Sequence, residues 1–376
     1  MKTAHLIYTR YYDFDNSEIT IGGVQTYIKG LNEVFKELGF CCNIYQPGDK
    51  NRNVSLNDGS FVQEINTSKQ KKRHDKIKAV VSYVESVFSN DNDVLVFLAN
   101  EITCKNNAKH SIAIQHGISW DYLYDRPLSR WRNIAHYAIK SKNAFRLIDK
   151  LSDVKQLVCV DHNFPNWVRS TAIKCDVPCT VVPNFTQIAP VFDKPKDYVN
   201  VIFARRFFTY RGTRIFAPAI VNILNKYNHV RVTVAGDGPD EEYLRDMLGE
   251  FGDRVSFIKY SASEAIGIHA DKHIAIVPTI GSEGTSLSCL EGMSAQCVPV
   301  CTDTGGLSNM ILDGFNGLLI DRTSESLEEA LSYLIENPNE RTVIASNSYE
   351  TVKQAFSYEK WKNRWKKIIK EMEKIK

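Results

Sequence analysis

Glu283 and Glu291 are separated by seven residues that begin with Gly284-Thr285-Ser286, and they follow an apolar run ending at Pro278. Thr285 or Ser286 can cap a helix, which leaves Glu283 in the loop at the positive end of that helix, beside free backbone N–H groups. The loop carboxylate could then accept hydrogen bonds from sugar hydroxyls, while the backbone amides from Gly284 to Ser286 would face a phosphate.

Glu291 is expected one turn into that helix, next to Leu290 on its inward side. A carboxylate on an apolar face is costly unless a partner bonds to it, and a ribose diol offers two hydroxyl donors. Glu291 is therefore interpreted as a ribose ligand. The alternative is a buried glutamate that is bonded only to the backbone.

An arginine-rich turn follows the apolar run 199–204 and reads Arg206-Phe207-Phe208-Thr209-Tyr210-Arg211-Gly212. The guanidinium groups of Arg206 and Arg211 could hold a diphosphate by bidentate, charge-assisted bonds. Arg205 and Arg214 crowd the same turn, and their mutual repulsion favours a nearby anion. A solvated basic turn is the alternative.

Two glycine pairs also lie where a ligand could approach the backbone. Gly236 and Gly238 bracket Asp237 after the run 230–235, although a purely structural turn explains them equally well. Gly22 and Gly23 precede an amphipathic helix, where their N–H groups could contact a phosphate or simply form a tight turn. The G-x-G-x-x-G spacing typical of nicotinamide sites is absent.

The elements that must position these residues alternate between apolar runs and helical patterns, which is typical of parallel α/β sheets. The expected strands are 5–9, 93–99, 111–115, 156–160, 199–204, 230–235, 254–258, 273–278 and 298–301. A chain of 376 residues exceeds one ordinary core, and prolines interrupt the pattern between 184 and 200. We expect domains over 1–185 and 186–356, and a helix over 357–376 that returns to the first domain. Two such sheets would face one another across a ligand cleft.

Composition limits the remaining possibilities. With 43% hydrophobic and 24% charged residues and a net charge of +3, the chain is typical of a soluble globular protein and not of a nucleic-acid binder. The N-terminus predicts a first strand and no secretory signal, so we expect a cytoplasmic protein. The nine cysteines show no Cys-x-x-Cys pair, and we expect reduced core residues and no bound metal.

The stretch from Arg126 to Lys150 carries seven basic residues against one acid, Asp149, and includes Trp131 and Tyr137. One reading is a solvated helix. The alternative is peripheral contact with an anionic membrane surface or a polyprenyl diphosphate at the inner face of the cytoplasmic membrane.

Taken together, these motifs resemble the retaining GT-B glycosyltransferases of glycosyltransferase family four, over nearly the whole chain. The residues that carry the resemblance are the glycine pair at 22–23, Val182-Pro183-Asn184, the turns at 206–212 and 235–239, the two glutamates separated by seven residues, Val298-Pro299-Val300, Gly305-Gly306 and Asn316-Gly317-Leu318-Leu319.

The resemblance implies a GT-B fold of two Rossmann-like, doubly wound parallel-sheet domains, and it implies roles for individual residues. Glu283 would contact the transferred sugar, as would His116 in Gln115-His116-Gly117. The other donor-binding residues would be Gly22, Gly23, Arg206, Arg211, Gly236, Gly238, Lys259, Gly284, Thr285, Ser286, Leu287 and Glu291.

The sequence departs from the family pattern at three positions. Arg211 stands where lysine is usual, and Arg205 stands where glycine is usual. Lys259 replaces a glycine near the place where relatives hold the base, so the identity of the base stays open.

The function that follows is a metal-independent, retaining transfer of a sugar, of the hexosyltransferase type. The donor would be a nucleotide-diphosphate sugar and the acceptor a hydroxyl of a glycan or lipid-linked glycan. Bacterial surface polysaccharide synthesis, whether lipopolysaccharide, capsule or exopolysaccharide, is the expected setting. A sugar-nucleotide epimerase of GT-B shape and a non-catalytic sugar-nucleotide or glycan binder are the alternatives, and the glutamate pair argues against the binder.

Overall fold

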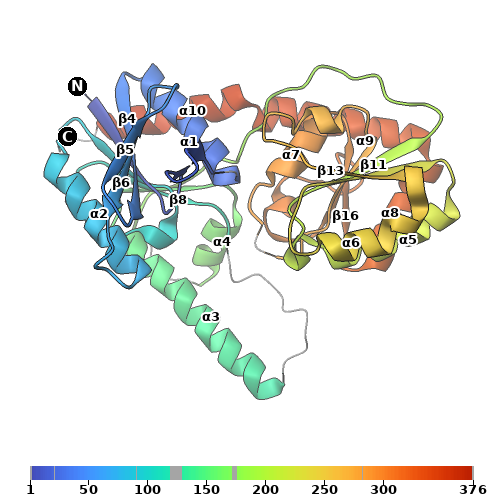
Figure 1. Cartoon of the computed structure of the whole chain (residues 1–376), viewed down its shortest axis with the longest axis horizontal. Coiled ribbons are helices and arrows are strands. Elements are labelled where there is room, and N and C mark those ends of the chain that lie inside the picture. Colours follow the sequence, from blue (N-terminus) through green and yellow to red (C-terminus); the bar gives the residue numbers. More distant parts are fainter. Residues whose placement is uncertain are drawn as a thin grey trace. The chain divides into compact units, whose positions relative to one another are not determined.

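The computed structural model describes residues 2–20, 22–89, 91–118, 129–171, 176–281 and 283–374. The chain divides into two compact units, and each is treated separately below (Figure 1). The first unit comprises Met1–His116, Arg126–Val182 and Lys362–Lys376, and the second comprises Gly117–Asp125 and Pro183–Trp361.

The first unit is built on an eight-stranded sheet with the order β10-β9-β8-β7-β1-β4-β6-β5. Every neighbouring pair is parallel except the edge pair of β5 and β6. The strands are β1 (Lys2–Ile7), β4 (Phe40–Gly48), β5 (Arg52–Ser55), β6 (Phe61–Asn66), β7 (Val94–Phe97), β8 (Ser111–Gln115), β9 (Gln156–Cys159) and β10 (Cys179–Val181). A small antiparallel ladder joins β2 (Tyr12–Asp13) to β3 (Glu18–Ile19).

Helices connect these strands, as parallel neighbours require. They are α1 (Gly23–Glu37), α2 (Arg73–Val87), α3 (Arg130–Leu151) and α4 (Asn163–Ser170). The apolar stripe of α1 is fully buried through Ile28, Leu31 and Phe35, and the helix ends just before Gly39, whose φ of 82° suits a residue without a Cβ.

The second unit contains a wholly parallel six-stranded sheet with the order β13-β12-β11-β14-β15-β16. Its strands are β11 (Val199–Ala204), β12 (Val230–Ala235), β13 (Val255–Ile258), β14 (Ile274–Val277), β15 (Val298–Thr302) and β16 (Leu318–Ile320). Its helices are α5 (Thr213–Lys226), α6 (Glu241–Leu248), α7 (Leu287–Ser294), α8 (Ser324–Glu336) and α9 (Pro338–Thr351).

Short 3-10 turns and one π-helical turn complete the described elements. They are η1 (Asn100–Ile102), η2 (Thr209–Arg211), η3 (Gly249–Arg254), η4 (Gly267–His269), η5 (Gly305–Asn309) and the π-helical η6 (Val352–Phe356). Strand β11 lies at the centre of its sheet between β12 and β14, and all six of its residues are buried. The chain therefore leaves β11 at the carboxyl edge of the sheet, where ligands bind in open α/β folds.

The last helix, α10 (Tyr358–Glu373), contributes residues to both units. Trp361 belongs to the second unit, where its ring centroid lies 4.4 Å from that of Phe185. Trp365 belongs to the first, where its Nε1 donates a hydrogen bond of 2.9 Å to the hydroxyl of Tyr27.

All nine expected strands are present, with ends that differ by a few residues at most. The prediction that the cysteines are core residues is wrong for Cys179, which is exposed on the edge strand β10, and for Cys41, which is half-buried. Cys175 lies outside the described residues.

A substitution of Gly236 tests how tightly the strand ends are packed. The residue has a φ of 139°, and a Cβ there would lie 2.0 Å from the carbonyl oxygen of Arg205. Gly236→Ala should lower the free energy of unfolding by more than about 2 kcal/mol in urea denaturation.

Gly249→Ala is the matched control, because no atom lies within 4 Å of its added Cβ. It should change the free energy of unfolding by no more than about 0.5 kcal/mol. Equal stability losses in the two variants would contradict the close approach at Gly236.

Candidate functional site

A buried ion cluster forms where β11 and β14 end. Glu283 Oε2 accepts hydrogen bonds from Arg205 Nη2 at 2.5 Å, from Thr279 Oγ1 at 2.9 Å and from Arg211 Nη1. Glu283 is 7% exposed and Arg205 is 6% exposed, while Arg211 is partly exposed. Because β11 and β14 are neighbours, their carboxyl ends bring these residues together from separate parts of the chain.

The electrostatics of the cluster keep Glu283 ionised. Burial alone would raise the pKa of this carboxyl, but the charges of Arg205 and Arg211 outweigh it and lower the pKa to about 2. Glu283 therefore carries its charge throughout the physiological range.

The sequence motifs predicted Arg206 as a residue of this site, whereas its neighbour Arg205 was not predicted to bind the ligand. Arg206 is exposed, and its guanidinium lies 4.9 Å from the ring centroid of Phe208. Side chains on an extended segment alternate between opposite faces, so only one of two adjacent arginines can point inward. Phe207 and Ala204 are buried as well, so apolar patterning does not identify which arginine is inside.

The turn at Gly236 and Gly238 lies against the backbone of the arginine-rich segment. Phe207 N donates to Asp237 O at 2.7 Å, and a Cβ on Gly238 would lie 2.6 Å from Phe207 O. These contacts explain both glycines as parts of a structural turn. They hold the segment that carries Arg205.

The Gly284–Ser286 segment is fixed by contacts on both sides. Glu283 O accepts a hydrogen bond of 2.9 Å from Gly306 N, and Thr285 O accepts one of 2.7 Å from Asn184 Nδ2. Ser286 is the residue before α7, and Leu287 begins the helix, but the Ser286 side chain makes no capping bond to the backbone. Its hydroxyl lies 3.3 Å from that of Ser288.

Glu291 lies in α7 and is partly exposed. Burial raises the pKa of Glu291 to about 7, against the opposing charge of Arg205. Tyr260 interacts electrostatically with Glu291, and burial together with the Glu291 charge raises the pKa of Tyr260. Lys259, at the end of β13, is exposed.

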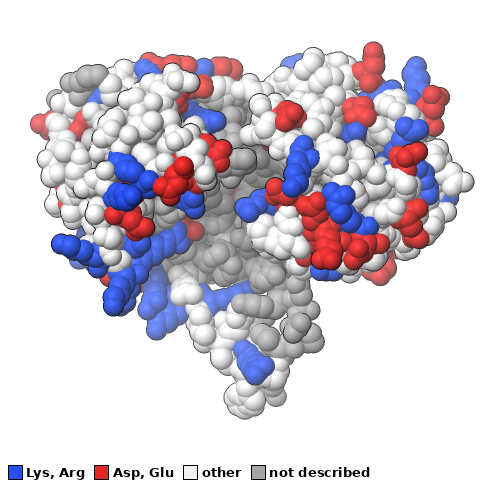
Figure 2. Space-filling view, viewed as in Figure 1, with Lys and Arg blue, Asp and Glu red and all other residues white. Residues whose placement is uncertain are grey.

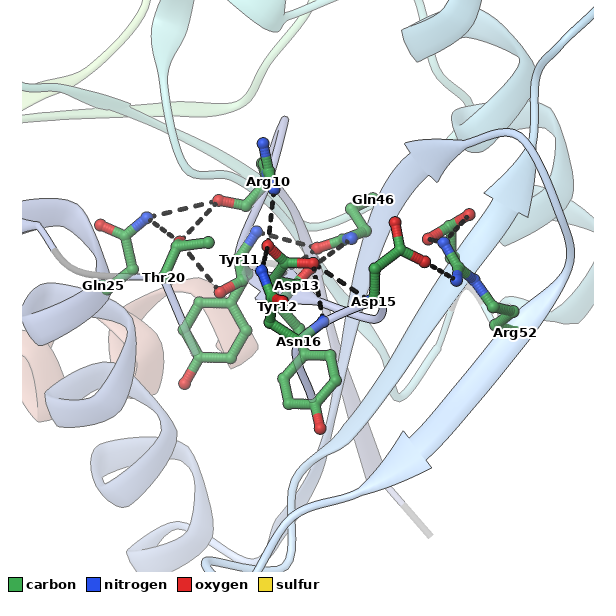
Figure 3. Close-up of polar contacts among 11 residues, drawn as sticks. Arg10, Tyr11, Tyr12, Asp13, Asp15, Asn16, Thr20, Gln25, Gln46 and Arg52 are labelled. Carbon is green, nitrogen blue, oxygen red and sulfur yellow. Dashed lines mark hydrogen bonds and ion pairs between the residues drawn. The ribbon is translucent and has the colours of Figure 1, made fainter. Parts of the chain in front are cut away.

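After a polar loop in the first unit, Gly22 is the N-cap of α1 and Gly23 is the first residue of that helix. Gln46 Oε1 on β4 accepts hydrogen bonds from the backbone N–H groups of Tyr11 and Tyr12, at 2.8 and 2.9 Å (Figure 3). Gln25 Nε2 donates to Thr20 Oγ1 at 2.7 Å. The loop is thus held in one shape from both ends before the chain enters the helix.

His116 follows β8 in the first unit. Its Nε2 lies 3.0 Å from the carbonyl oxygen of Leu98, which requires a proton on Nε2, and its ring packs edge-on against Tyr27 at 5.1 Å. Burial lowers the pKa of His116 to about 4, although the bond to Leu98 opposes this shift. The imidazole is neutral at pH 7, with Nδ1 as its acceptor nitrogen.

The described residues include no group of three or more His, Cys, Asp or Glu side chains that could hold a metal ion. In the same part of the chain, no helix is long and apolar enough to cross a bilayer. Of the basic stretch 126–150, residues 126–128 lie outside the described residues.

Comparison with known families and proteins identifies relatives of this chain. The family model "Glycosyl transferases group 1" matches residues 184–351. An uncharacterized glycosyltransferase of Methanocaldococcus jannaschii is 24% identical over 296 residues, which cover 76% of this chain and 71% of that protein. The lipopolysaccharide core biosynthesis glycosyltransferase LpsD of Rhizobium meliloti is 26% identical over 216 residues, covering 55% of this chain and 61% of LpsD.

Among solved structures, HepE from Anabaena in complex with UDP is similar with a TM-score of 0.71 and 13% identity, over 99% of this chain and 100% of HepE. HepE has also been solved with UDP-glucose. The likeness confirms the predicted GT-B class of two Rossmann-like units with parallel sheets.

The raised pKa of Glu291 predicts a pH-dependent stability. Between about pH 4.5 and pH 7 the folded state keeps a proton that the unfolded state releases, so this contribution is complete below pH 4.5 and is lost as pH rises through 7. Glu291→Gln should therefore unfold with a free energy roughly 1 to 3 kcal/mol higher than wild type above pH 7, and nearly equal to it near pH 4.5.

Urea denaturation across this pH range measures the difference. Glu250→Gln, which alters an exposed glutamate in the same unit, is the control and should follow the wild-type curve. Parallel curves for wild type and Glu291→Gln would show that the Glu291 pKa is not raised.

Proposed function

We propose how this chain acts as a glycosyltransferase of GT-B fold, on the premise that its residues 184–351 match the glycosyl transferases group 1 family model. It transfers a sugar from a nucleotide diphosphate to an acceptor hydroxyl, with retention at the anomeric carbon. The observation that carries this proposal is the convergence of Arg205, Arg211 and Glu283 beside the N-terminus of α7.

The proposed donor site divides into four parts along the ligand, for the diphosphate, the ribose, the base and the transferred sugar. The start of α7, from Gly284 to Leu287, offers backbone N–H groups and the positive end of the helix dipole to the diphosphate, with Arg211 and Arg206 as cations. Glu291 accepts hydrogen bonds from the ribose hydroxyls, and Lys259 lies toward the base. Glu283 contacts the transferred sugar.

This arrangement suits the charge that develops during transfer. As the bond to the sugar breaks, negative charge accumulates on the leaving diphosphate, and fixed cations with oriented amides stabilise it without reorganisation. We infer that no metal ion is needed. For Gly22, Gly23 and the neutral His116 of the first unit, contact with the donor stays a prediction from the sequence.

The donor and the setting follow from the relatives. UDP is the first nucleotide to test, because the similar protein HepE is solved with UDP and UDP-glucose. A role in bacterial surface polysaccharide synthesis is supported by the similarity to LpsD, which acts in lipopolysaccharide core biosynthesis.

The proposed acceptor is a lipid-linked glycan at an anionic membrane surface, which α3 contacts. Helix α3 exposes large apolar side chains: Trp131 is 80% exposed, Tyr137 is 65% exposed and Ile139 is 60% exposed. Lys and Arg side chains gather on the first unit around α2 and α3 (Figure 2). Exposed aromatic rings beside basic side chains are the composition of interfacial helices.

Calorimetric titration with UDP, GDP, ADP and TDP tests the donor assignment. We expect selective binding of one diphosphate, with the same affinity in the presence of EDTA. Glu291→Ala should weaken that binding about ten- to hundredfold, because two hydrogen bonds from the ribose hydroxyls to Glu291 are lost.

Glu250→Ala is the control and should bind like wild type. Absence of binding by all four diphosphates would contradict the transferase site, and loss of binding in EDTA would contradict metal independence. Conversion of a nucleotide sugar without any acceptor would instead favour the epimerase.

Vesicle flotation tests the membrane surface. The wild type should float with anionic vesicles and not with neutral ones, and Trp131→Ser combined with Tyr137→Ser should reduce the bound fraction at least about fivefold. Phe315→Ser, which removes an exposed aromatic ring from the second unit, should have no effect. Equal flotation with neutral and anionic vesicles would overturn the proposed contact.

A further inference from the structure

Arg205 is the inward-facing member of the arginine pair that follows β11. It is 6% exposed, and its Nη2 donates to Glu283 Oε2 at 2.5 Å. Its backbone is held on both sides, because Arg205 N donates to Ala235 O at 2.9 Å and Gly236 packs against Arg205 O. The side chain therefore has little freedom to leave the cluster.

The second terminal nitrogen of Arg205 is buried and lacks a partner. Nη1 has no hydrogen-bond acceptor in the part of the chain that the structure describes. A buried charged donor without an acceptor is costly, and native structures rarely keep one unless a ligand or ordered water completes it. Nη1 thus indicates an acceptor that joins the site from outside the chain.

The charge balance indicates that this acceptor is an anion. Two guanidinium groups, from Arg205 and Arg211, share the single carboxylate of Glu283, and the third donor, Thr279, is neutral. Glu291 does not restore the balance, because its burial favours the protonated form. The cluster therefore holds an excess positive charge at the N-terminal end of α7.

We propose that Arg205 Nη1 binds the diphosphate of the donor nucleotide while Nη2 holds Glu283. This rests on the proposed transferase function and adds a binding residue to it. One guanidinium then contacts the leaving group and fixes the carboxylate that faces the sugar. The planar fork of arginine can serve two oxyanions in this way, whereas a lysine ammonium is a single point charge.

Titration of the full-length protein with inorganic pyrophosphate, UDP and uridine tests the proposal. Arg205→Gln should weaken pyrophosphate and UDP binding about ten- to hundredfold and leave uridine binding unchanged. Arg205→Lys keeps the charge and should recover part of the loss. Arg214→Gln is the control, because Arg214 is exposed on the same turn and pairs with Asp240.

The outcomes separate this inference from the proposed function. If Arg205→Gln binds pyrophosphate and UDP like wild type and loses affinity only for UDP-glucose, Arg205 merely positions Glu283 and the proposal is wrong. If wild type binds pyrophosphate but no nucleoside diphosphate, the transferase assignment fails, and loss of pyrophosphate binding in Arg205→Gln still supports the anion site.

Thermal unfolding of each variant without ligand checks that the fold is intact. Glu283 retains Arg211 and Thr279 when Arg205 is replaced, so the variants should fold. If Arg205→Gln is unstable, Arg205→Lys carries the test, and pyrophosphate affinity equal to wild type together with unchanged affinity for UDP would overturn the proposal.

Discussion

The burial of one carboxylate charge constrains the whole second unit. Removing Glu283 from water is tolerable only with cationic and hydroxyl partners at hydrogen-bond distance, and Arg205, Arg211 and Thr279 supply them from two loops. Those loops must then approach closely. Gly212 allows this at Pro278, where a Cβ would lie 1.9 Å from the carbonyl oxygen, and Gly306 allows it at Gly284.

The two glutamates of the α7 segment have different pKa values because their neighbours differ. The pKa of Glu283 is lowered to about 2 by two arginines, whereas the pKa of Glu291 is raised to about 7 by burial with weaker compensation. One carboxyl is therefore a permanent anion, and the other exchanges its proton near neutral pH. Environments that push two pKa values apart in this manner are typical of sites that divide their tasks.

Sequence patterns predicted nine strands of the two large sheets, because buried parallel strands are continuous apolar runs, and they predicted the helix start beside Glu283. Strands β4, β5, β6, β10 and β16 were not predicted. Strand β4 was missed because Asn43, Gln46 and Pro47 interrupt its apolar pattern, and Gln46 has a structural role in holding the β1–α1 loop. The choice between Arg205 and Arg206 depends on the direction of a side chain after the strand ends, which residue types alone do not encode.

The first unit is not one continuous stretch of chain, because α10 places Trp361 in the second unit and Trp365 in the first. Recombination between relatives is constrained by this division. A chimera with a single crossover near Pro183 would pair the α1 helix of one parent with the C-terminal helix of the other, so that Tyr27 would meet a foreign residue in place of Trp365. Exchange of the intact segment Pro183–Trp361 requires a further crossover inside α10, between residues 361 and 362.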